Sequence, residues 1–345
     1  MQGLLKKIMK NALSRFFLAI ALLFLSSLSF VPYGAVAADK IIGIYASQAI
    51  SNSMPWIAKE AGLFQKYNLD FELIYVPSAG ISTAALLGGD AEIAMVGGLG
   101  VIRAFVAGAT EPVIIGGVKN VLTHSILAGQ KIKKPEDLKG KKVGITRIGS
   151  NSHYFTIQAL RRFGLDPDRD ITFVQTGGAP EVLAALVKGV IDGGTMTSPG
   201  DAKAIAQGFH YVVYGPDLHI PYSNSGIVTR RSVIVRRPQV VGQFMRAMAE
   251  AVKILHADKE FTYRVLAKEL RMDDRKVLDA AYNAEIKVLE PRLEIQSEGV
   301  QAILDEVSQI DPRARKVKPQ ELIDRRFLDE MEKSGFFRRL WAQNR

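Results

Sequence analysis

The stretch from Thr83 to Gly98 reads TAALLGGDAEIAMVGG, which is typical of a helix end, a glycine turn and a short buried strand. One hundred positions later, Leu183 to Ser198 read LAALVKGVIDGGTMTS. Both stretches keep Ala-Ala-Leu, a following aliphatic residue and the turn glycine, and both place an acidic residue at the same point, at Glu92 and Asp192. This repeat predicts two similar α/β units, each with a polar, glycine-rich loop at the end of a strand.

The register of the repeat extends upstream without a gap. The β-like segment FELIY at 71–75 aligns with ITFVQ at 171–175. In open α/β sheets, ligands bind beyond the carboxyl ends of the strands, so two lobes that face each other would form a cleft. A chain of 345 residues, of which 48% are hydrophobic, can bury the cores of two such lobes.

The N-terminus has the three-part pattern of a secretory signal peptide. Residues 1–15 carry four basic residues and no acidic one, residues 16–25 are apolar, and small residues follow at 35–38. We expect residues 1–38 to be removed by cleavage near Ala37 or Ala38, which predicts a periplasmic protein. The alternative is a retained anchor, because residues 16–38 carry no charge and could cross a bilayer. Cleavage is favoured because the strongly apolar part is short.

Charge and cysteine content exclude several classes of function. The net charge of +10 falls to about +6 without the four basic residues of the signal, and the arginine pairs lie far apart in the sequence. Neither feature is typical of a nucleic-acid-binding protein. The chain has no cysteine, which excludes a thiol nucleophile, thiolate metal sites and a cysteine-linked lipid anchor.

The sequence lacks the main signatures of catalysis and of metal or cofactor binding. It contains no Gly-x-Ser-x-Gly, His-Glu-x-x-His or phosphate-binding Gly-Lys-Ser/Thr motif, and its five histidines lack metal-ligand spacing. We therefore expect no enzyme activity, no metal and no cofactor. Asp90, Glu92 and Asp192 lie in glycine turns, where we expect them to hydrogen-bond the local backbone instead of acting as catalytic acids.

Several predicted strands run into polar or glycine-rich segments at which a helix starts, for example after residues 40–45, 70–76 and 142–146. Helix N-termini present unpaired backbone N–H groups and a positive dipole end. From residue 238 onward the apolar spacing is helical, and we expect these helices to pack back on the first lobe. The expected layout is lobe I at 39–130, lobe II at 131–219 and a return to lobe I at 220–345.

Five segments together have a recognisable order. They are WIAKEAGLF at 56–64, ALLGGDAEIA at 85–94, LKGKKVG at 138–144, AALVKGVID at 184–192 and RFLDEMEKSGF at 326–336. In this order the chain resembles the exported substrate-binding proteins of ABC importers, in the nitrate, sulfonate and taurine group related to thiamine-pyrimidine-precursor binding proteins. The resemblance covers essentially the chain after the signal. It implies a type II periplasmic-binding-protein fold, with two strands crossing between the lobes, hinge closure around a small solute and docking on a membrane permease.

The resemblance also implies which loops contact the solute, and these are polar segments at the predicted strand ends. The implied solute-binding residues are Ser47, Gln48, Ser78, Ala79, Gly80, Gly97, Gly98, Ser150, Asn151, Ser152, His153, Thr197, Ser198 and Asn224. Gly97 and Gly98 carry no hydroxyl, so an anion at their loop would be held by backbone amides. For His153, a hydrogen bond to an acidic solute and a capping or solvent-facing role both stay open.

The leading hypothesis is a monomeric, exported receptor that captures a small anionic or polar organic solute for an ABC importer. The resemblance suggests a sulfonate, taurine, nitrate, a carboxylate or a pyrimidine-like compound, and no nucleic acid is expected as a partner. One alternative is an enzyme of thiamine-precursor biosynthesis on the same fold, against which the export signal and the missing catalytic motifs count. The other is a ligand-sensing module anchored by an uncleaved N-terminal helix.

Overall fold

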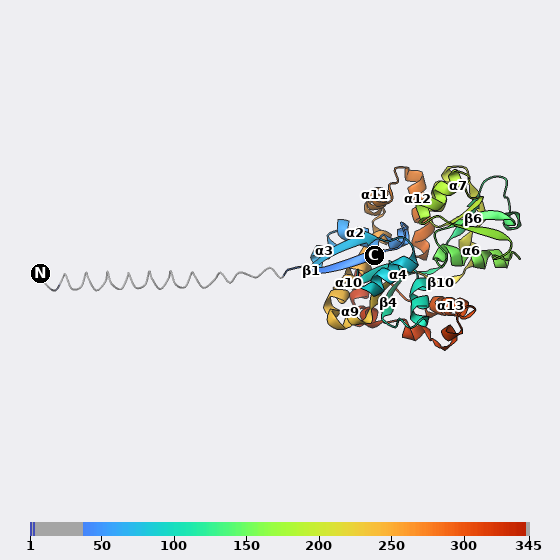
Figure 1. The fold of residues 1–345 in the computed structure, drawn as a ribbon. Coiled ribbons are helices and arrows are strands. Elements are labelled where there is room, and N and C mark those ends of the chain that lie inside the picture. The colour runs from blue at the N-terminus through green and yellow to red at the C-terminus, as the bar shows by residue number, and fades with distance from the viewer. Residues whose placement is uncertain (2, 4–36, 343–345) are drawn as a thin grey trace. The chain divides into compact units, whose positions relative to one another are not determined.

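The computed structural model describes Met1, Gly3 and residues 37–342 of the chain (Figure 1). Its contacts divide the chain into residues 1–37 and residues 38–345, and the elements below belong to the second part. Most of the predicted signal peptide lies outside the described residues, so its cleavage stays a prediction. Among the described residues, no helix is both long and apolar enough to span a bilayer.

The first sheet has five strands in the order β2-β1-β3-β10-β4. The strands are β1 (Asp39–Tyr45), β2 (Leu69–Tyr75), β3 (Ile93–Val96), β4 (Pro112–Val121) and β10 (Pro221–Arg230). β1 runs parallel to β2 and β3, whereas β10 runs antiparallel to its neighbours β3 and β4. β3 and β10 are buried over nearly their whole length, as expected for central strands that are covered on both faces.

Each parallel strand of the first sheet leads into a helix. The helices are α2 (Met54–Glu60), α3 (Leu63–Lys66), α4 (Ala79–Gly88) and α5 (Gly98–Val106), and η2 (Ile50–Asn52) precedes α2. Pro55 lies in the first turn of α2, where its missing N–H removes no helix hydrogen bond. Gly62 follows α2 with a φ of 69°, a conformation that favours glycine, and it separates α2 from α3.

The second sheet also has five strands, in the order β7-β6-β8-β5-β9. The strands are β5 (Ser125–Ala128), β6 (Lys141–Ile145), β7 (Ile171–Gln175), β8 (Gly193–Met196) and β9 (His210–Val213). Its helices are α6 (Asn151–Arg162), α7 (Ala179–Val187) and α8 (Gly200–Ala206), with η3 (Pro135–Leu138) before β6. In Figure 1 these elements gather in green, apart from the blue elements β1 and α2. β5 takes the place that β10 has in the first sheet, antiparallel to both neighbours.

The two copies of the sequence repeat form equivalent backbone hydrogen bonds, one hundred positions apart. The amide of Glu92 donates to the carbonyl oxygen of Ile42 at 2.9 Å, and the amide of Asp192 donates to that of Lys142 at 2.9 Å. Two further equivalent bonds are Val76 to Tyr45 at 3.0 Å and Thr176 to Ile145 at 3.0 Å. The prediction of two similar α/β units is therefore confirmed, down to the bonds that place each loop.

Two connections join the sheets. Residues 122–124 lead from β4 into β5, and η4 (Gly215–Leu218) lies between β9 and β10. Each connection starts in one sheet and ends in the other, so the two-lobed α/β fold with two crossings is confirmed. The lobe boundaries at residues 130 and 219 stay predictions.

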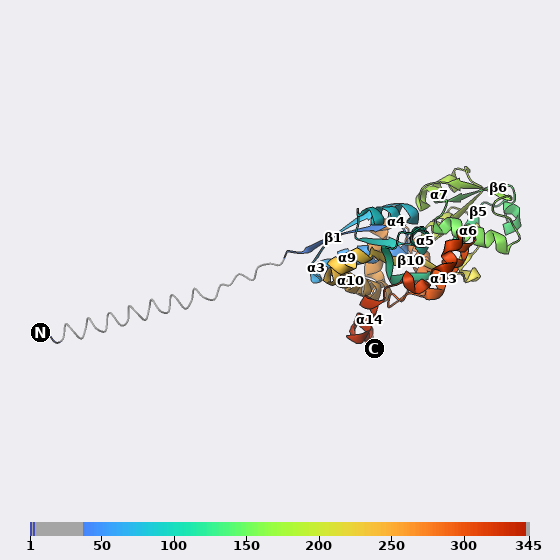
Figure 2. The same ribbon diagram turned by 60° about the horizontal axis from the view of Figure 1, so that its bottom comes forward.

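The chain ends in helices. They are α9 (Arg231–Arg236), α10 (Pro238–Ala257), α11 (Lys259–Leu270), α12 (Arg275–Glu285), α13 (Ser297–Ser308), α14 (Arg326–Lys333) and α15 (Phe336–Ala342), with η5 (Ile286–Val288), η6 (Pro312–Lys316) and η7 (Pro319–Glu321) among them. α10 packs on α2 and β2 of the first lobe. α13 lies beside β10 in both views (Figures 1 and 2) and also meets α6, because Gln158 Nε2 donates to Glu306 Oε2 at 2.9 Å.

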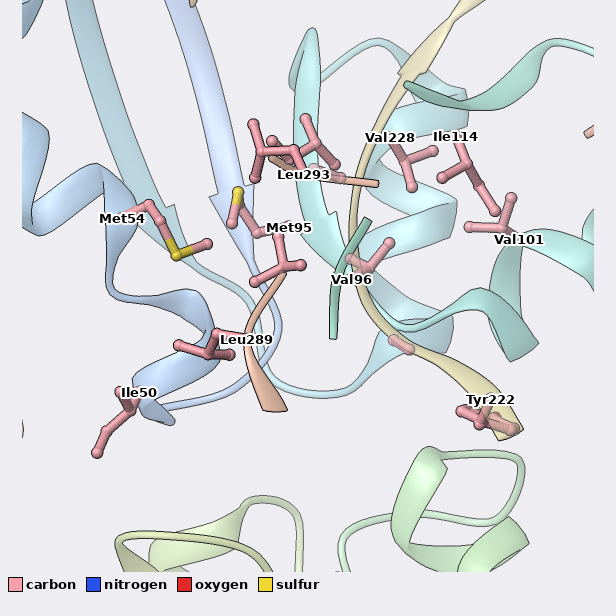
Figure 3. Packing of buried hydrophobic residues seen from close by; sticks show 14 of the residues in the cluster. Ile50, Met54, Met95, Val96, Val101, Ile114, Tyr222, Val228, Leu289 and Leu293 are labelled. Atoms are coloured by element: carbon pink, nitrogen blue, oxygen red, sulfur yellow. The ribbon is translucent and has the colours of Figure 1, made fainter. Parts of the chain in front are cut away.

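The main core fixes the strands that deliver the cavity loops. Figure 3 shows Met95 and Val96 of β3 beside Val228 of β10 and Ile114 of β4, and each is at most 2% exposed. Tyr222 is fully buried at the other end of β10, toward the second lobe (Figure 3). Burial of a large apolar side chain contributes about 2 kcal/mol. This rigid framework anchors the loop that follows β3 and the first half of β10.

Candidate functional site

A cavity of about 70 Å³ lies where loops from the two sheets meet. The predicted residues that line it are Ser47, Ser78, Ala79, Gly97, Ser150, Asn151, Ser152, Thr197 and Asn224. The other lining residues are Ala46, Ala49, Ser51, Asn52, Val96, Lys119, His124, Thr146, Gly178, Ala179, Thr195, Met196 and Ser225. The wall is therefore built mainly from small polar side chains and backbone. That these residues bind a solute stays a prediction.

Four helices begin at this cavity. The residues just before α4, α5, α6 and α7 are Ser78, Gly97, Ser150 and Gly178, and all four line the cavity. The first-turn N–H groups of a helix have no partner within the helix, and its N-terminus carries a partial positive charge. Only the α6 start has a side-chain cap among these four, from the Ser150 hydroxyl. The arrangement suits an anionic or acceptor-rich group.

Gly97 allows the two lobes to come into contact. A Cβ atom at this position would lie 2.3 Å from Nδ2 of Asn151, far closer than packed atoms approach. The Asn151 amide, at the start of α6, donates to the carbonyl oxygen of Asn224 at 2.8 Å and to its Oδ1 at 2.9 Å. Tyr222 Oη donates to Asn151 Oδ1 at 3.3 Å. The first residue of α6 is thus held by two residues of β10.

Hydroxyl groups of the second lobe form a tight cluster at the cavity. Thr146 Oγ1 donates to Ser150 Oγ at 2.8 Å, and the hydroxyls of Ser150 and Ser152 lie 2.9 Å apart. The backbone N–H of Thr146 donates to Ser152 Oγ at 3.1 Å. These bonds fix the rotamers of both serines, so the cluster presents preorganised hydroxyls without mobile side chains.

On the first lobe, Asn52 ties the loop after β1 to β10. Its Nδ2 donates to the carbonyl oxygen of Ser47 at 2.9 Å, and its Oδ1 accepts from Ser225 Oγ at 3.0 Å. Both Asn52 and Ser225 line the cavity and are buried. Neither residue was among those predicted from the sequence. The signal was the polar run Ser51-Asn52-Ser53, which lies in the predicted polar loop after residues 40–45.

A buried ion pair that the sequence analysis missed lies at the cavity wall. Lys119 of β4 lines the cavity, and its Nζ lies 2.8 Å from Oε2 of Glu285 at the end of α12. The two side chains are 1% and 2% exposed. Nζ also donates to Thr123 Oγ1 at 2.8 Å and to Glu285 Oε1 at 3.0 Å. Thr197 Oγ1, from the loop after β8, donates to the same Oε1 at 3.3 Å.

His124 also lines the cavity, although it lies outside the loops that the sequence predicted to contact a solute. Its ring stacks on Phe155 with the centroids 5.9 Å apart, and among the described residues its Nδ1 has no hydrogen-bond partner. Burial, and secondarily the positive charge of Lys119, lower the pKa of His124 to about 3. The imidazole is therefore neutral at physiological pH.

The remaining predicted residues lie outside the lining of this cavity. Gln48 lines a neighbouring hollow with Leu183 and Lys203. Gly80 belongs to the first turn of α4, and Gly98 begins α5 against Ser223. Ser198 Oγ donates to Asp201 Oδ1 at 2.7 Å, and His153 Nδ1 accepts the N–H of Gly149 at 3.2 Å.

The His153 ring lies edge-on to Phe173, with centroids 4.8 Å apart. Burial, and next the charge of Arg103, lower the pKa of His153 to about 4. Because its Nδ1 accepts a backbone N–H within its own loop, the capping role left open by the sequence has structural support. A contact between His153 and a solute stays a prediction.

The acidic residues of the repeat differ in their partners. Asp192 Oδ2 accepts the backbone N–H of Lys142 at 2.8 Å. It therefore bonds backbone, but in β6, fifty positions away, and not the local backbone of its own turn. Glu92 instead accepts from Arg237 Nη1 at 2.7 Å, so the expectation of a local backbone bond is wrong for this side chain. Within the part of the chain that the structure describes, no group of acidic, histidine or cysteine residues is placed to hold a metal.

A larger hollow of about 450 Å³ lies elsewhere, over β1 and β2. It is lined by Lys40, Tyr45, Pro55, Trp56, Lys59, Phe64, Asp70, Phe71, Glu72, Leu73 and Glu269. These residues come from the first lobe and from α11, and none belongs to the loops at which the four helices start. We therefore take the smaller cavity between the sheets as the candidate site, because converging strand ends and helix N-termini characterise binding sites in α/β proteins.

Two sheets with antiparallel cross-over strands and a polar cavity between them define a protein of the periplasmic-binding-protein fold. The alkanesulfonate-binding protein SsuA of Xanthomonas axonopodis, solved with bound MOPS, has the same fold: it superposes with a TM-score of 0.71 at 19% identity, over 84% of this chain and 100% of that one. The family model described as NMT1/THI5 like matches residues 52–260, which is more than half of the chain. The chain belongs to this NMT1/THI5-like family.

Curated relatives extend the comparison. A putative binding protein of Brucella abortus is 25% identical over 292 residues, which cover 83% of this chain and 88% of the relative. The taurine-binding periplasmic protein of Escherichia coli is 25% identical over 244 residues, which cover 66% of this chain and 69% of the relative. Both relatives are thus named as binding proteins.

Proposed function

We propose that this protein is the extracytoplasmic substrate-binding protein of an ABC importer and captures a small anionic or polar organic solute. The observation that carries the proposal is the convergence of four helix N-termini and a cluster of fixed hydroxyls on one cavity between two lobes. Such a site supplies hydrogen-bond donors to a solute without any reacting group. The names of the taurine-binding and alkanesulfonate-binding proteins support a sulfonate-like solute.

In this mechanism, the solute binds to one lobe and the second lobe closes over it by rotation about the two connections between the sheets. Closure removes water from the cavity and strengthens the hydrogen bonds to the solute. The Asn151 contacts with Gly97 and Asn224 lie between elements of the two lobes, so they would form on closure and break on release. The closed protein, exported to the periplasm and monomeric, then docks on its permease.

The test is to identify what the protein carries. Solute released by denaturation of the purified full chain is identified by mass spectrometry, and its binding is measured by titration calorimetry beside taurine, isethionate, nitrate and small carboxylates. We expect binding of at least one compound in the micromolar range or tighter, roughly −8 kcal/mol. Absence of any carried solute and of any binding would refute the proposal.

The same samples test the enzyme alternative. Each compound that binds is incubated with the protein and followed by mass spectrometry for conversion. We expect no turnover, because no nucleophile activated by a base lies in the described cavity wall. Formation of a product at a rate that scales with protein concentration would replace the transport proposal with an enzymatic one.

A further inference from the structure

The charge of the cavity wall depends on a residue that does not line it. Among the described residues that line the cavity, Lys119 is the one that carries a full charge, since His124 is neutral. Glu285 is absent from the lining, yet its carboxylate lies 2.8 Å from the Lys119 ammonium. A lysine in a binding cavity is ordinarily read as an anion-binding group, so the state of this ammonium decides which solutes the site can take.

All three donors of the Lys119 ammonium are already engaged. A lysine ammonium has three N–H donors, and it meets three acceptors here: Thr123 Oγ1 at 2.8 Å, Glu285 Oε1 at 3.0 Å and Glu285 Oε2 at 2.8 Å. A solute could bond this ammonium only by displacing one of these acceptors. Because both partners are buried, displacement would leave a carboxylate without its compensating charge.

The carboxylate is held in place from several directions. Glu285 Oε1 accepts from Thr123 Oγ1 at 3.1 Å and from Thr197 Oγ1 at 3.3 Å, in addition to Lys119. Asp201, which also lies in this region, bonds Ser198, and burial raises its pKa, so it is biased toward the neutral acid. The ion pair is thus a closed, charge-neutral unit.

We propose that Glu285 acts as a positioning residue that removes Lys119 from anion recognition, so that the site selects solutes with one anionic group or none and disfavours dianions. The proposal rests on the proposed function. A single anionic group is served by the helix N-termini, whose partial charges need no side chain. Those partial charges do not offset the cost of transferring a second full charge out of water.

The test uses three probes of similar size and calorimetry on the full chain at neutral pH. Hydroxyethyl methyl sulfone is neutral, isethionate is a monoanion and sulfoacetate is a dianion. For the wild-type protein we expect isethionate to bind at least about thirtyfold tighter than sulfoacetate. Equal or tighter binding of sulfoacetate would overturn the inference. If none of the probes binds, while the carried solute is also absent, the proposed function fails and this inference fails with it.

Two variants separate the role of the pair from a general structural role. Glu285→Gln leaves the ammonium uncompensated, and we expect the preference for isethionate over sulfoacetate to shrink by roughly tenfold or more. Lys119→Met combined with Glu285→Leu removes both charges, and we expect isethionate to bind within about threefold of wild type.

The double variant of Lys119 and Glu285 tests whether the Lys119 ammonium bonds the anionic solute directly. A loss of more than about thirtyfold in isethionate affinity, with an unchanged circular dichroism spectrum, would show that Lys119 holds the anion itself. Should Glu285→Gln fail to fold, the wild-type probe ratio and the double variant still test the proposal. A change in the ratio between probes is not expected from destabilisation alone, because all probes meet the same folded population.

Discussion

The loop after β3 and the loop after β8 occupy equivalent places in the repeat, yet they reach the cavity by different means. At the first loop, Gly97 has no side chain, and this lets the amide of Asn151 come close to the backbone. At the second loop, Thr197 stands at the position of Gly97 and uses its hydroxyl to bond Glu285. One copy of the repeat supplies space and the other supplies a side chain. Equivalent positions of a repeated backbone therefore serve two different roles in this protein.

The largest loss of stability should come from changing Glu285, the residue that Thr197 of the second loop bonds. Glu285→Gln leaves the buried ammonium of Lys119 without a counter-charge, and we expect the free energy of unfolding to fall by about 3–5 kcal/mol. Urea denaturation followed by circular dichroism measures this. As a matched control, Glu332→Gln removes an exposed acid paired with Arg292 and should cost less than about 1 kcal/mol. Equal losses in the two variants would contradict the buried-pair argument.

The first loop is tested by adding the missing methyl group. In Gly97→Ala the new Cβ would force the Asn151 side chain away and break its two bonds to Asn224, each worth about 1 kcal/mol. We expect solute affinity to fall by roughly thirtyfold, or about 2 kcal/mol, in calorimetry with the carried solute.

Two further variants sharpen this result. Gly129→Ala places a Cβ in open space and should leave affinity unchanged. Asn151→Ala should weaken binding about as much as Gly97→Ala, and the double variant should add little, because both act through the same pair of bonds. Additive losses would mean that Gly97 serves the cavity by another route.

Lowering the pH should reduce the stability of the protein through His124, which lies in the cavity wall. Its folded pKa of about 3 lies below the unfolded value of about 6.5, so the unfolded chain binds the proton more readily and stability falls as pH drops below 6.5. Between pH 6.5 and 5 the loss from this group is about 2 kcal/mol. Asp201, with a raised pKa, has the opposite slope at lower pH.

The difference between wild type and His124→Asn isolates the histidine from the other titrating groups. We expect urea denaturation at pH 6.5 and at pH 5 to show a clearly smaller loss in the variant. An identical pH dependence of the two proteins would mean that His124 is accessible to protons in the folded state.

The smallest effect is expected for the side chain that distinguishes the two loops. Thr197→Val keeps the shape but removes the hydroxyl that bonds Glu285, and we expect about 1 kcal/mol less stability. Thr172→Val, at an exposed position of β7, should change stability by less than about 0.5 kcal/mol. A thermal melt compares the pair. No difference between them would remove the hydroxyl from the network.

Local sequence patterns were sufficient to predict most of the fold and part of the candidate site. The repeat at 83–98 and 183–198 predicted the two units because turn glycines and buried strands leave a signal within a few residues. The polar loops at the strand ends followed from the same patterns, and Ser78, Gly97 and Ser150 from these loops line the cavity. The solute they would bind does not follow from these patterns.

The wall residues that the sequence did not reveal depend on contacts between distant segments. Lys119 lies within a strand whose pattern reads as ordinary buried sheet, and its partner Glu285 is 166 positions away in a helix. Their pairing exists only after α12 packs against the loop elements of both lobes. A charged residue in an otherwise apolar strand is the one local sign that could have drawn attention to Lys119.

The strand order has a consequence for how the chain acquires its structure during synthesis. β10 separates β3 from β4 in the first sheet, and all five strands of the second sheet are made between β4 and β10. A nascent chain that has emerged up to β9 therefore contains every strand of the second sheet, while the first sheet still lacks β10, the strand that joins β3 to β4. Folding order should invert the order of translation, because the first lobe must wait for a long-range loop closure that the second lobe avoids.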